Sequence, residues 1–133
     1  MSRINARRNA FSLLFQYDFI DIHEIDENKN IFFKENPDIE EGDKKYILET
    51  VDGTMKNLEE IDAIIGEYAR GWTTERMSKV DLAILRLAVY EMKFSDEAPD
   101  SVAINEAVEL AKKYSSDEAP SFINGILGKI SQR

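Results

Sequence analysis

Residues 79–94 are apolar on nearly every side of the helix that their spacing predicts. A helix with so little polar surface is stable only when other helices bury it. Ser78 and Asp81, at its start, fit a capping box, in which each side chain bonds the other residue's backbone amide. We therefore expect this segment at the centre of a helical fold. Its apolar side chains are Val80, Leu82, Ile84, Leu85, Leu87, Val89 and Met92.

The rest of the chain shows helical periodicity and no sustained alternation of the kind a strand requires. Helices are predicted over residues 4–20 and 43–69, and the polar residues 21–42 between them are expected to hold a loop and one short helix. Two further helices are predicted over residues 101–114 and from Pro120 onward. The chain is thus predicted to be all-α, with an N-terminal helical subdomain over residues 1–70 and a C-terminal one over residues 71–133.

The last predicted helix carries three local signals. Ser115 and Glu118 fit a second capping box, and Pro120 suits a first helical turn. Gly125 and Gly128 lie inside the apolar pattern of the helix. A phosphate-binding loop has its glycines before the helix begins, so this position argues against a phosphate site. We expect these glycines to permit close helix packing or a flexible helix end.

The residue composition excludes several classes of catalytic and metal-binding site. The 133 residues, 43% hydrophobic and 32% charged, suit one globular domain over residues 1–133. There is no Cys and one His, His23, which excludes disulfides, thiolate zinc sites and two-histidine chemistry. No nucleotide-binding, nucleophile or metalloprotease motif is present, and the acid cluster around Glu40 lacks a calcium-loop pattern. We expect no enzyme, no catalytic residue, no cofactor and no metal; His23, Asp18 and Asp21 are interpreted as loop residues.

The charge is unevenly distributed along a chain whose net charge is −9. Residues 1–17 carry Arg3, Arg7 and Arg8 and no acid, whereas residues 18–67 carry 16 acids and 5 bases. Such a start also occurs in mitochondrial transit peptides, but its large aromatic residues and its continuation into a globular pattern favour a folded helix. The longest apolar stretch in the central segment ends at Arg86, so we expect no membrane span and a cytoplasmic protein.

The first predicted helix has two different apolar sides. Ala10, Leu13, Leu14 and Tyr17 share one, while Arg8, Phe11, Phe15 and Phe19 share another. The second side has two interpretations. It is either buried as well, with arginines at an exposed start, or it is a platform on which unpaired bases stack while arginine binds phosphate.

Three segments resemble the NusB family of bacterial transcription antitermination factors. They are residues 80–91 (VDLAILRLAVYE), residues 99–112 with VAINEAVELA inside them, and residues 122–127 (FINGIL). Arg7-Arg8 and Leu14-Phe15-Gln16 are similar to the family's Arg-rich start and its L-Y-Q-like run, in which Phe15 replaces a Tyr. The resemblance covers nearly the whole chain except residues 21–45. It implies about six to seven helices in two small helical bundles, and no enzymatic activity.

The resemblance also implies a function and a set of sites. The family binds the single-stranded boxA element of nascent ribosomal RNA leaders as a heterodimer with NusE, a ribosomal small-subunit protein. That heterodimer joins RNA polymerase with NusA and NusG, and the free chain is a monomer or a homodimer. By this resemblance, or by charge alone for the two lysines, the expected RNA-binding residues are Arg3, Arg7, Arg8, Phe15, Lys112, Lys113, Glu118, Phe122 and Asn124. The NusE surface is expected on the helices flanking Trp72 to Arg86, with Glu75, Arg76 and Asp81 as its polar contacts.

Two other functions stay open at this point. A NusB-like domain precedes the catalytic domain of an rRNA cytosine methyltransferase family, of which this chain could be only a fragment. A protein-interaction adaptor without RNA contact is the second alternative. Arg86 is expected to be a structural ion-pair partner, with Glu106 or Glu109 as its acid, and Asn105 is expected to have a structural role.

Overall fold

The computed structural model describes residues 3–69, 71 and 76–132, and this part of the chain is all-α without a strand. It holds seven α-helices and one short 3₁₀ helix, which confirms the predicted fold class. The helices are α1 (Arg3–Tyr17), α2 (Ile25–Glu35), α3 (Glu41–Lys56), α4 (Leu58–Tyr68), α5 (Lys79–Lys93), α6 (Asp100–Tyr114) and α7 (Ala119–Ser131), and the 3₁₀ helix is η1 (Ile22–Glu24).

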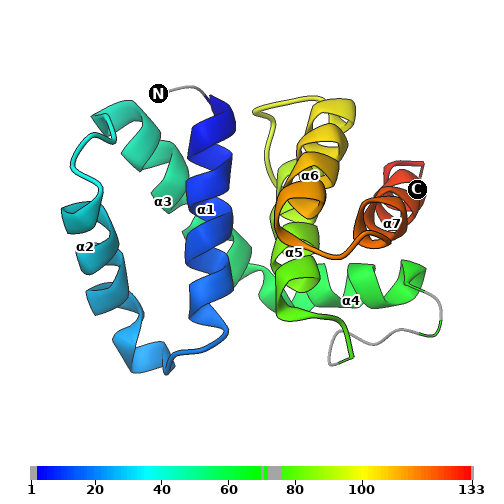
Figure 1. Ribbon diagram of the computed structural model, residues 1–133, viewed down its shortest axis with the longest axis horizontal. Coiled ribbons are helices and arrows are strands. Elements are labelled where there is room, and N and C mark those ends of the chain that lie inside the picture. Colours follow the sequence, from blue (N-terminus) through cyan, green and yellow to red (C-terminus); the bar gives the residue numbers. More distant parts are fainter. Residues whose placement is uncertain (1–2, 70, 72–75, 133) are drawn as a thin grey trace.

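Helix α5 lies at the centre of the molecule, as its apolar sequence predicts. Figure 1 shows α1, α2 and α3 on one side of α5 and α4, α6 and α7 on the other. Nine of its 15 residues are buried, and all of these except Glu91 belong to one hydrophobic core that draws on α1 to α7. Because α4 packs on α5 and α7, part of the predicted N-terminal half lies with the C-terminal helices. The division at residue 70 stays a prediction.

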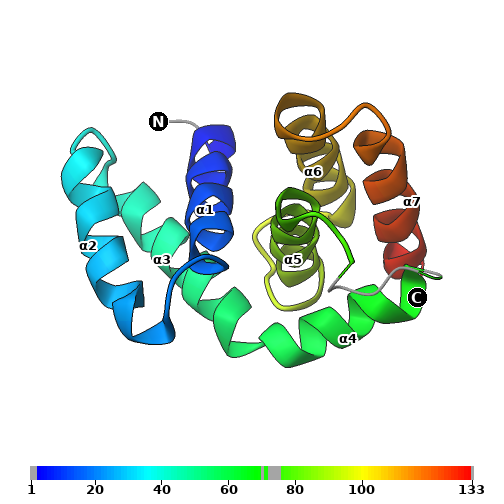
Figure 2. The same cartoon turned by 60° about the horizontal axis from the view of Figure 1, so that its bottom comes forward.

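The predicted single helix over residues 43–69 is wrong, because the chain turns at Asn57. The Asn57 backbone amide and its side-chain Nδ2 both donate to the Gly53 carbonyl, at 3.1 and 2.8 Å. The backbone bond is the last i to i−4 bond of α3, and the Nδ2 bond gives the same carbonyl a second donor at the C-terminus of the helix. Figure 2 shows α4 leaving α3 at a steep angle and passing beneath α5 toward α7. The apolar residues keep a spacing of three or four residues through this turn, so the sequence pattern does not indicate where α3 ends.

The expectations for α7 need two corrections. Ser115 does not cap α7, because it ends α6 and its hydroxyl donates to the Asp81 carboxylate at 2.6 Å. Glu118 occupies the N-cap without a side-chain bond, while Pro120 lies in the first turn as predicted. At α5, the Ser78 hydroxyl accepts a hydrogen bond from the Asp81 amide at 3.1 Å, which is one of the two bonds of the predicted capping box.

Glycine-mediated packing occurs in α3 and not in α7. A Cβ atom at Gly125 or Gly128 would meet nothing within 4 Å, so neither glycine permits close packing. A Cβ at Gly53 would lie 2.5 Å from the Tyr90 ring. Gly53 therefore allows α3 and α5 to approach each other.

Two glycine substitutions test this contact. Gly53→Ala is expected to destabilise the protein by about 1 kcal/mol, because the Tyr90 ring must move and this outweighs the gain in helix propensity. Gly125→Ala, in open space on α7, is expected to stabilise it by about 0.5–1 kcal/mol. Urea denaturation measures both free energies of unfolding. An equal gain from the two substitutions would show that the α3–α5 contact does not need Gly53.

Candidate nucleic-acid interface

Four aromatic rings form a continuous row between α1 and the end of α6. The ring centroids of Phe11 and Phe15 are 6.2 Å apart, and those of Phe15 and Phe19 are 5.0 Å apart. Tyr114 of α6 adds a fourth ring, 5.4 Å from Phe11. Phe19 is 62% exposed and Tyr114 45% exposed, whereas Phe11 is buried and Phe15 half-buried. This aromatic row thus combines both interpretations of the first helix: its middle supports the core, and its ends offer ring faces to solvent.

Cations lie at the Phe11–Tyr114 end of the aromatic row. Arg8 precedes Phe11 by one helical turn on the same side of α1 and is half-buried. Within residues 3–69, 71 and 76–132, no carboxylate pairs with Arg8. The Lys113 ammonium lies 5.4 Å from the Tyr114 ring centroid, and the exposed Lys112 pairs with Glu109 at 3.3 Å. This end can therefore bring positive charge and aromatic surface to the same ligand.

Arg3 is oriented toward α3 rather than along the row. Its guanidinium carbon lies 4.0 Å from the Tyr46 ring centroid, and its Nη1 atom is 3.8 Å from the Asp43 carboxylate. The side chain is 42% exposed, so it retains access to solvent.

Arg7 is buried and belongs to a polar cluster inside the core. Its Nε lies 3.0 Å from both Glu91 carboxylate oxygens, and the Tyr46 hydroxyl donates to the same carboxylate at 2.8 Å. Burial alone would lower the Arg7 pKa, but the charge of Glu91 outweighs it and holds the pKa above its usual value. Burial and the Glu91 charge also raise the pKa of Tyr46. Arg7 is therefore held as a cation in the protein interior, whereas its neighbour Arg8 is half-buried.

A groove of about 320 Å³ between the start of α5 and the start of α7 brings several predicted residues together. Arg76 and Asp81, predicted for the partner, line it beside Glu118 and Phe122, which were predicted for RNA. Its lining also includes Met77, Ser78, Ser116 and Ala119. Asn124 is exposed on α7 outside this lining, and Glu75 and Trp72 lie outside the described residues. The hydrogen bond from Ser115 to Asp81 connects this groove to the residue next to Tyr114.

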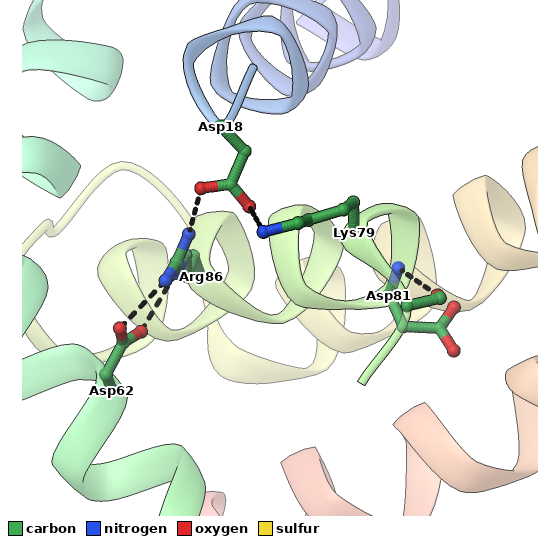
Figure 3. Close-up of polar contacts among 6 residues, drawn as sticks. Asp18, Asp62, Lys79, Asp81 and Arg86 are labelled. Atoms are coloured by element: carbon green, nitrogen blue, oxygen red, sulfur yellow. Dashed lines mark hydrogen bonds and ion pairs between the residues drawn. The ribbon is translucent and has the colours of Figure 1, made fainter. Parts of the chain in front are cut away.

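Arg86 has the structural role that the sequence indicated, but its predicted partners are wrong. Figure 3 shows its guanidinium between two carboxylates: both Asp62 contacts are 2.8 Å, and Asp18 lies at 3.4 Å. Lys79 also reaches Asp18, at 3.4 Å. Burial by itself would lower the Arg86 pKa, but the hydrogen bonds and the charge of Asp62 outweigh this effect and raise the pKa above its usual value. Arg86 points toward α1 and α4, whereas α6, with Glu106 and Glu109, packs elsewhere on α5.

Asp21 and His23 lie in the exposed segment after α1, whereas Asp18, also interpreted as a loop residue, pairs with Arg86 and Lys79. Asp21 caps η1 by accepting the His23 amide at 3.1 Å, and His23 is exposed. In the described residues, no group of three or more His, Cys, Asp or Glu side chains is placed to hold a metal ion. Nor does any helix in these residues have the length and apolar character needed to span a membrane.

Sequence comparison identifies the family. A sequence model of the NusB family matches residues 4–132. The chain belongs to the NusB family. The transcription antitermination protein NusB of Acetivibrio thermocellus is 50% identical over 130 residues, covering 98% of this chain and 88% of that protein. The NusB of Agathobacter rectalis is 46% identical over 131 residues, covering 98% of this chain and all of that protein.

Solved NusB structures share the fold along the whole chain. NusB of T. maritima superposes with a TM-score of 0.88 at 34% identity, covering 100% of this chain and 92% of that one. The NusB chain in a crystal structure of antitermination factors NusB and NusE with double-stranded RNA gives a TM-score of 0.82 at 29% identity, covering 99% and 98%. The arrangement of α1, α5 and α6 described here is thus a NusB arrangement.

The sequence missed two parts of this interface. Tyr114 joins the aromatic row only because α6 ends beside the middle of α1, a contact between residues far apart in the chain. Asp62 is one of many acids in the chain, and only the turn at Asn57 brings it to Arg86. No local pattern distinguishes either residue.

Substitution of the two adjacent arginines separates a structural role from a surface role. Arg7→Gln leaves the Glu91 carboxylate buried without its cation and is expected to cost about 3–5 kcal/mol of unfolding free energy. Arg8→Gln is expected to change it by less than about 0.5 kcal/mol. Thermal and urea denaturation of the two variants make the comparison. Similar small effects from both would contradict the role assigned to the buried cluster.

Proposed function

We propose that this chain is a transcription antitermination factor that binds the boxA element of nascent ribosomal RNA leaders as a heterodimer with NusE. In this proposal the heterodimer joins the elongating RNA polymerase with NusA and NusG in the cytoplasm, and the chain itself catalyses no reaction. Family membership over residues 4–132 carries the proposal. A family member at 29% identity has been crystallised with NusE and RNA, which supports both partners.

The aromatic row is the proposed RNA surface. The exposed faces of Phe19 and Tyr114 suit stacking with unpaired bases, which is worth about 1–3 kcal/mol per base. Arg8 and Lys113 are placed to meet backbone phosphates at the Phe11–Tyr114 end. Arg7, although it matches the family's Arg-rich start, is assigned a structural role because of its burial. The other expected RNA contacts are Arg3, Phe15, Lys112, Glu118, Phe122 and Asn124.

The groove between α5 and α7 is the proposed NusE surface, with Arg76 and Asp81 as its polar contacts. Asp81 accepts a bond from Ser115, and Ser115 follows Tyr114 of the aromatic row. A partner that fixes Asp81 would therefore also fix the end of α6 on which Tyr114 stands. Few cations serve the row, and the chain carries a net charge of −9, so we infer that RNA affinity without NusE is low.

Binding of labelled boxA RNA tests this function, measured with and without NusE at two salt concentrations. A scrambled RNA and a duplex form of boxA are the comparison ligands. Single-stranded boxA is expected to bind more tightly than either, and NusE to strengthen that binding. Equal, weak binding to all three RNAs even with NusE would contradict the proposal and favour an adaptor without RNA contact.

Two variants separate stacking from charge on the aromatic row. Phe19→Ala is expected to weaken boxA binding at least fivefold without changing its salt dependence, because a stacking surface is lost. Arg8→Gln is expected to reduce the steepness of the log–log salt dependence by about 0.7, the contribution of one neutralised phosphate. Lys93→Gln, at an exposed position at the end of α5, removes an equal charge away from the row. An equal effect of Lys93→Gln would show that net charge alone controls the affinity.

A further inference from the structure

A second groove lies between α2 and α3, on the far side of the molecule from α6 and α7 (Figures 1 and 2). It has a volume of about 560 Å³. Helix α2 contributes Lys29, Phe33 and Lys34, and α3 contributes Lys44, Leu48 and Asp52, which follow one another at intervals of four residues along one side of that helix. None of these residues belongs to the aromatic row or to the α5–α7 groove.

The charge of this groove is opposite to that of its surroundings. Residues 18–67 hold 16 acids and only 5 Lys or Arg residues. Three of those five, Lys29, Lys34 and Lys44, line the groove, and a fourth, Lys45, follows Lys44 on α3. The lining has one acid, Asp52. Cations that are scarce in this half of the chain are therefore concentrated between two helices.

The two ends of the groove differ. At one end the Lys29 ammonium lies 2.7 Å from the Asp52 carboxylate and 3.8 Å from the Asp26 carboxylate, so that end carries no free positive charge. At the other end the Lys44 ammonium lies over the Phe33 ring, 5.1 Å from its centroid. No carboxylate pairs with Lys34 or Lys44 in the described part of the chain. This open end thus presents two unpaired ammonium groups above an apolar floor of Phe33 and Leu48, both partly buried.

We propose that the α2–α3 groove is a docking site for a short acidic segment of a partner protein, with an apolar side chain on Phe33 and Leu48 and flanking carboxylates on Lys34 and Lys44. Such a site is independent of RNA and NusE binding. Charge complementarity selects this occupant, because cations and apolar surface converge at the same end.

A nucleic acid fits the same groove less well. Its backbone carries a charge at every nucleotide, so any strand longer than the groove would pass over acids such as Glu41 and Glu49 on the exposed side of α3. A peptide can place its carboxylates only where the lysines stand and leave the neighbouring positions neutral. The acidic surroundings therefore discriminate against RNA more strongly than against a short peptide.

The test uses three labelled probes against the full chain. They are a 12-residue peptide of Glu, Leu and Phe, the same peptide with Gln in place of Glu, and a 10-nucleotide oligouridine. Fluorescence anisotropy measures affinity, and amide chemical shifts of Phe33 and Leu48 locate the site. The acidic peptide is expected to bind about tenfold more tightly than the Gln peptide, consistent with two exposed charge pairs.

The double variant Lys34→Gln with Lys44→Gln is expected to lose most of that tenfold preference. A matched variant, Lys93→Gln with Lys129→Gln, removes the same charge from exposed positions on α5 and α7 and is expected to retain it. Circular dichroism confirms that both variants fold. Loss of preference in both variants, shifts at Phe19 instead of Phe33, no binding of the acidic peptide, or tighter lysine-dependent binding of oligouridine would each overturn the proposal. Because the boxA measurements use different residues, failure here leaves that function standing.

Discussion

The burial of α5 imposes a constraint on the rest of the molecule, because this helix carries two charged side chains into the bundle. A buried charge without a partner costs several kcal/mol, so Arg86 and Glu91 each need an opposite charge from a neighbouring helix. Helix α1 supplies one near each of its ends, Arg7 for Glu91 and, just past its last residue, Asp18 for Arg86. Helix α4 adds Asp62, and α3 adds the Tyr46 hydroxyl. These polar contacts set how α1 lies along α5.

The candidate interface follows from that placement. With α1 fixed along α5, Phe11 comes beside Tyr114, and the aromatic row becomes continuous between helices that are distant in the chain. The Ser115–Asp81 bond then ties the end of α6 to the start of α5, where the α5–α7 groove begins. The proposed RNA surface and the proposed NusE surface thus share one rigid support. A partner bound at the groove would order the row through this bond without contacting RNA itself, which is a physical reason to expect that NusE strengthens RNA binding.

The parts of this structure that sequence could predict are those encoded locally. The bounds of α5 were predicted to within one residue, because a cap at Ser78 precedes a segment that is apolar all round. The turn at Asn57 was missed because α3 and α4 both bury apolar residues at the same spacing, and an asparagine amide bonding a carbonyl leaves no trace in that pattern. The partners of Arg86 were missed for a related reason: the choice among many acids depends on where the helices lie. The same holds for Arg7 and Arg8, neighbours in sequence, of which one is buried and the other partly exposed.

Charge explains why such a protein can be selective. The chain carries a net charge of −9, which repels nucleic acid at a distance. The few cations beside the aromatic row therefore attract phosphates only at short range, once a strand is stacked on the row. Stacking tolerates any base, so the proposed RNA surface on the row would by itself hold single strands without reading their sequence. Sequence preference then has to come from the geometry around the row, above all from a partner that fixes the end of α6 and adds contacts of its own. On this reasoning the isolated chain would discriminate between RNAs less well than the proposed heterodimer with NusE.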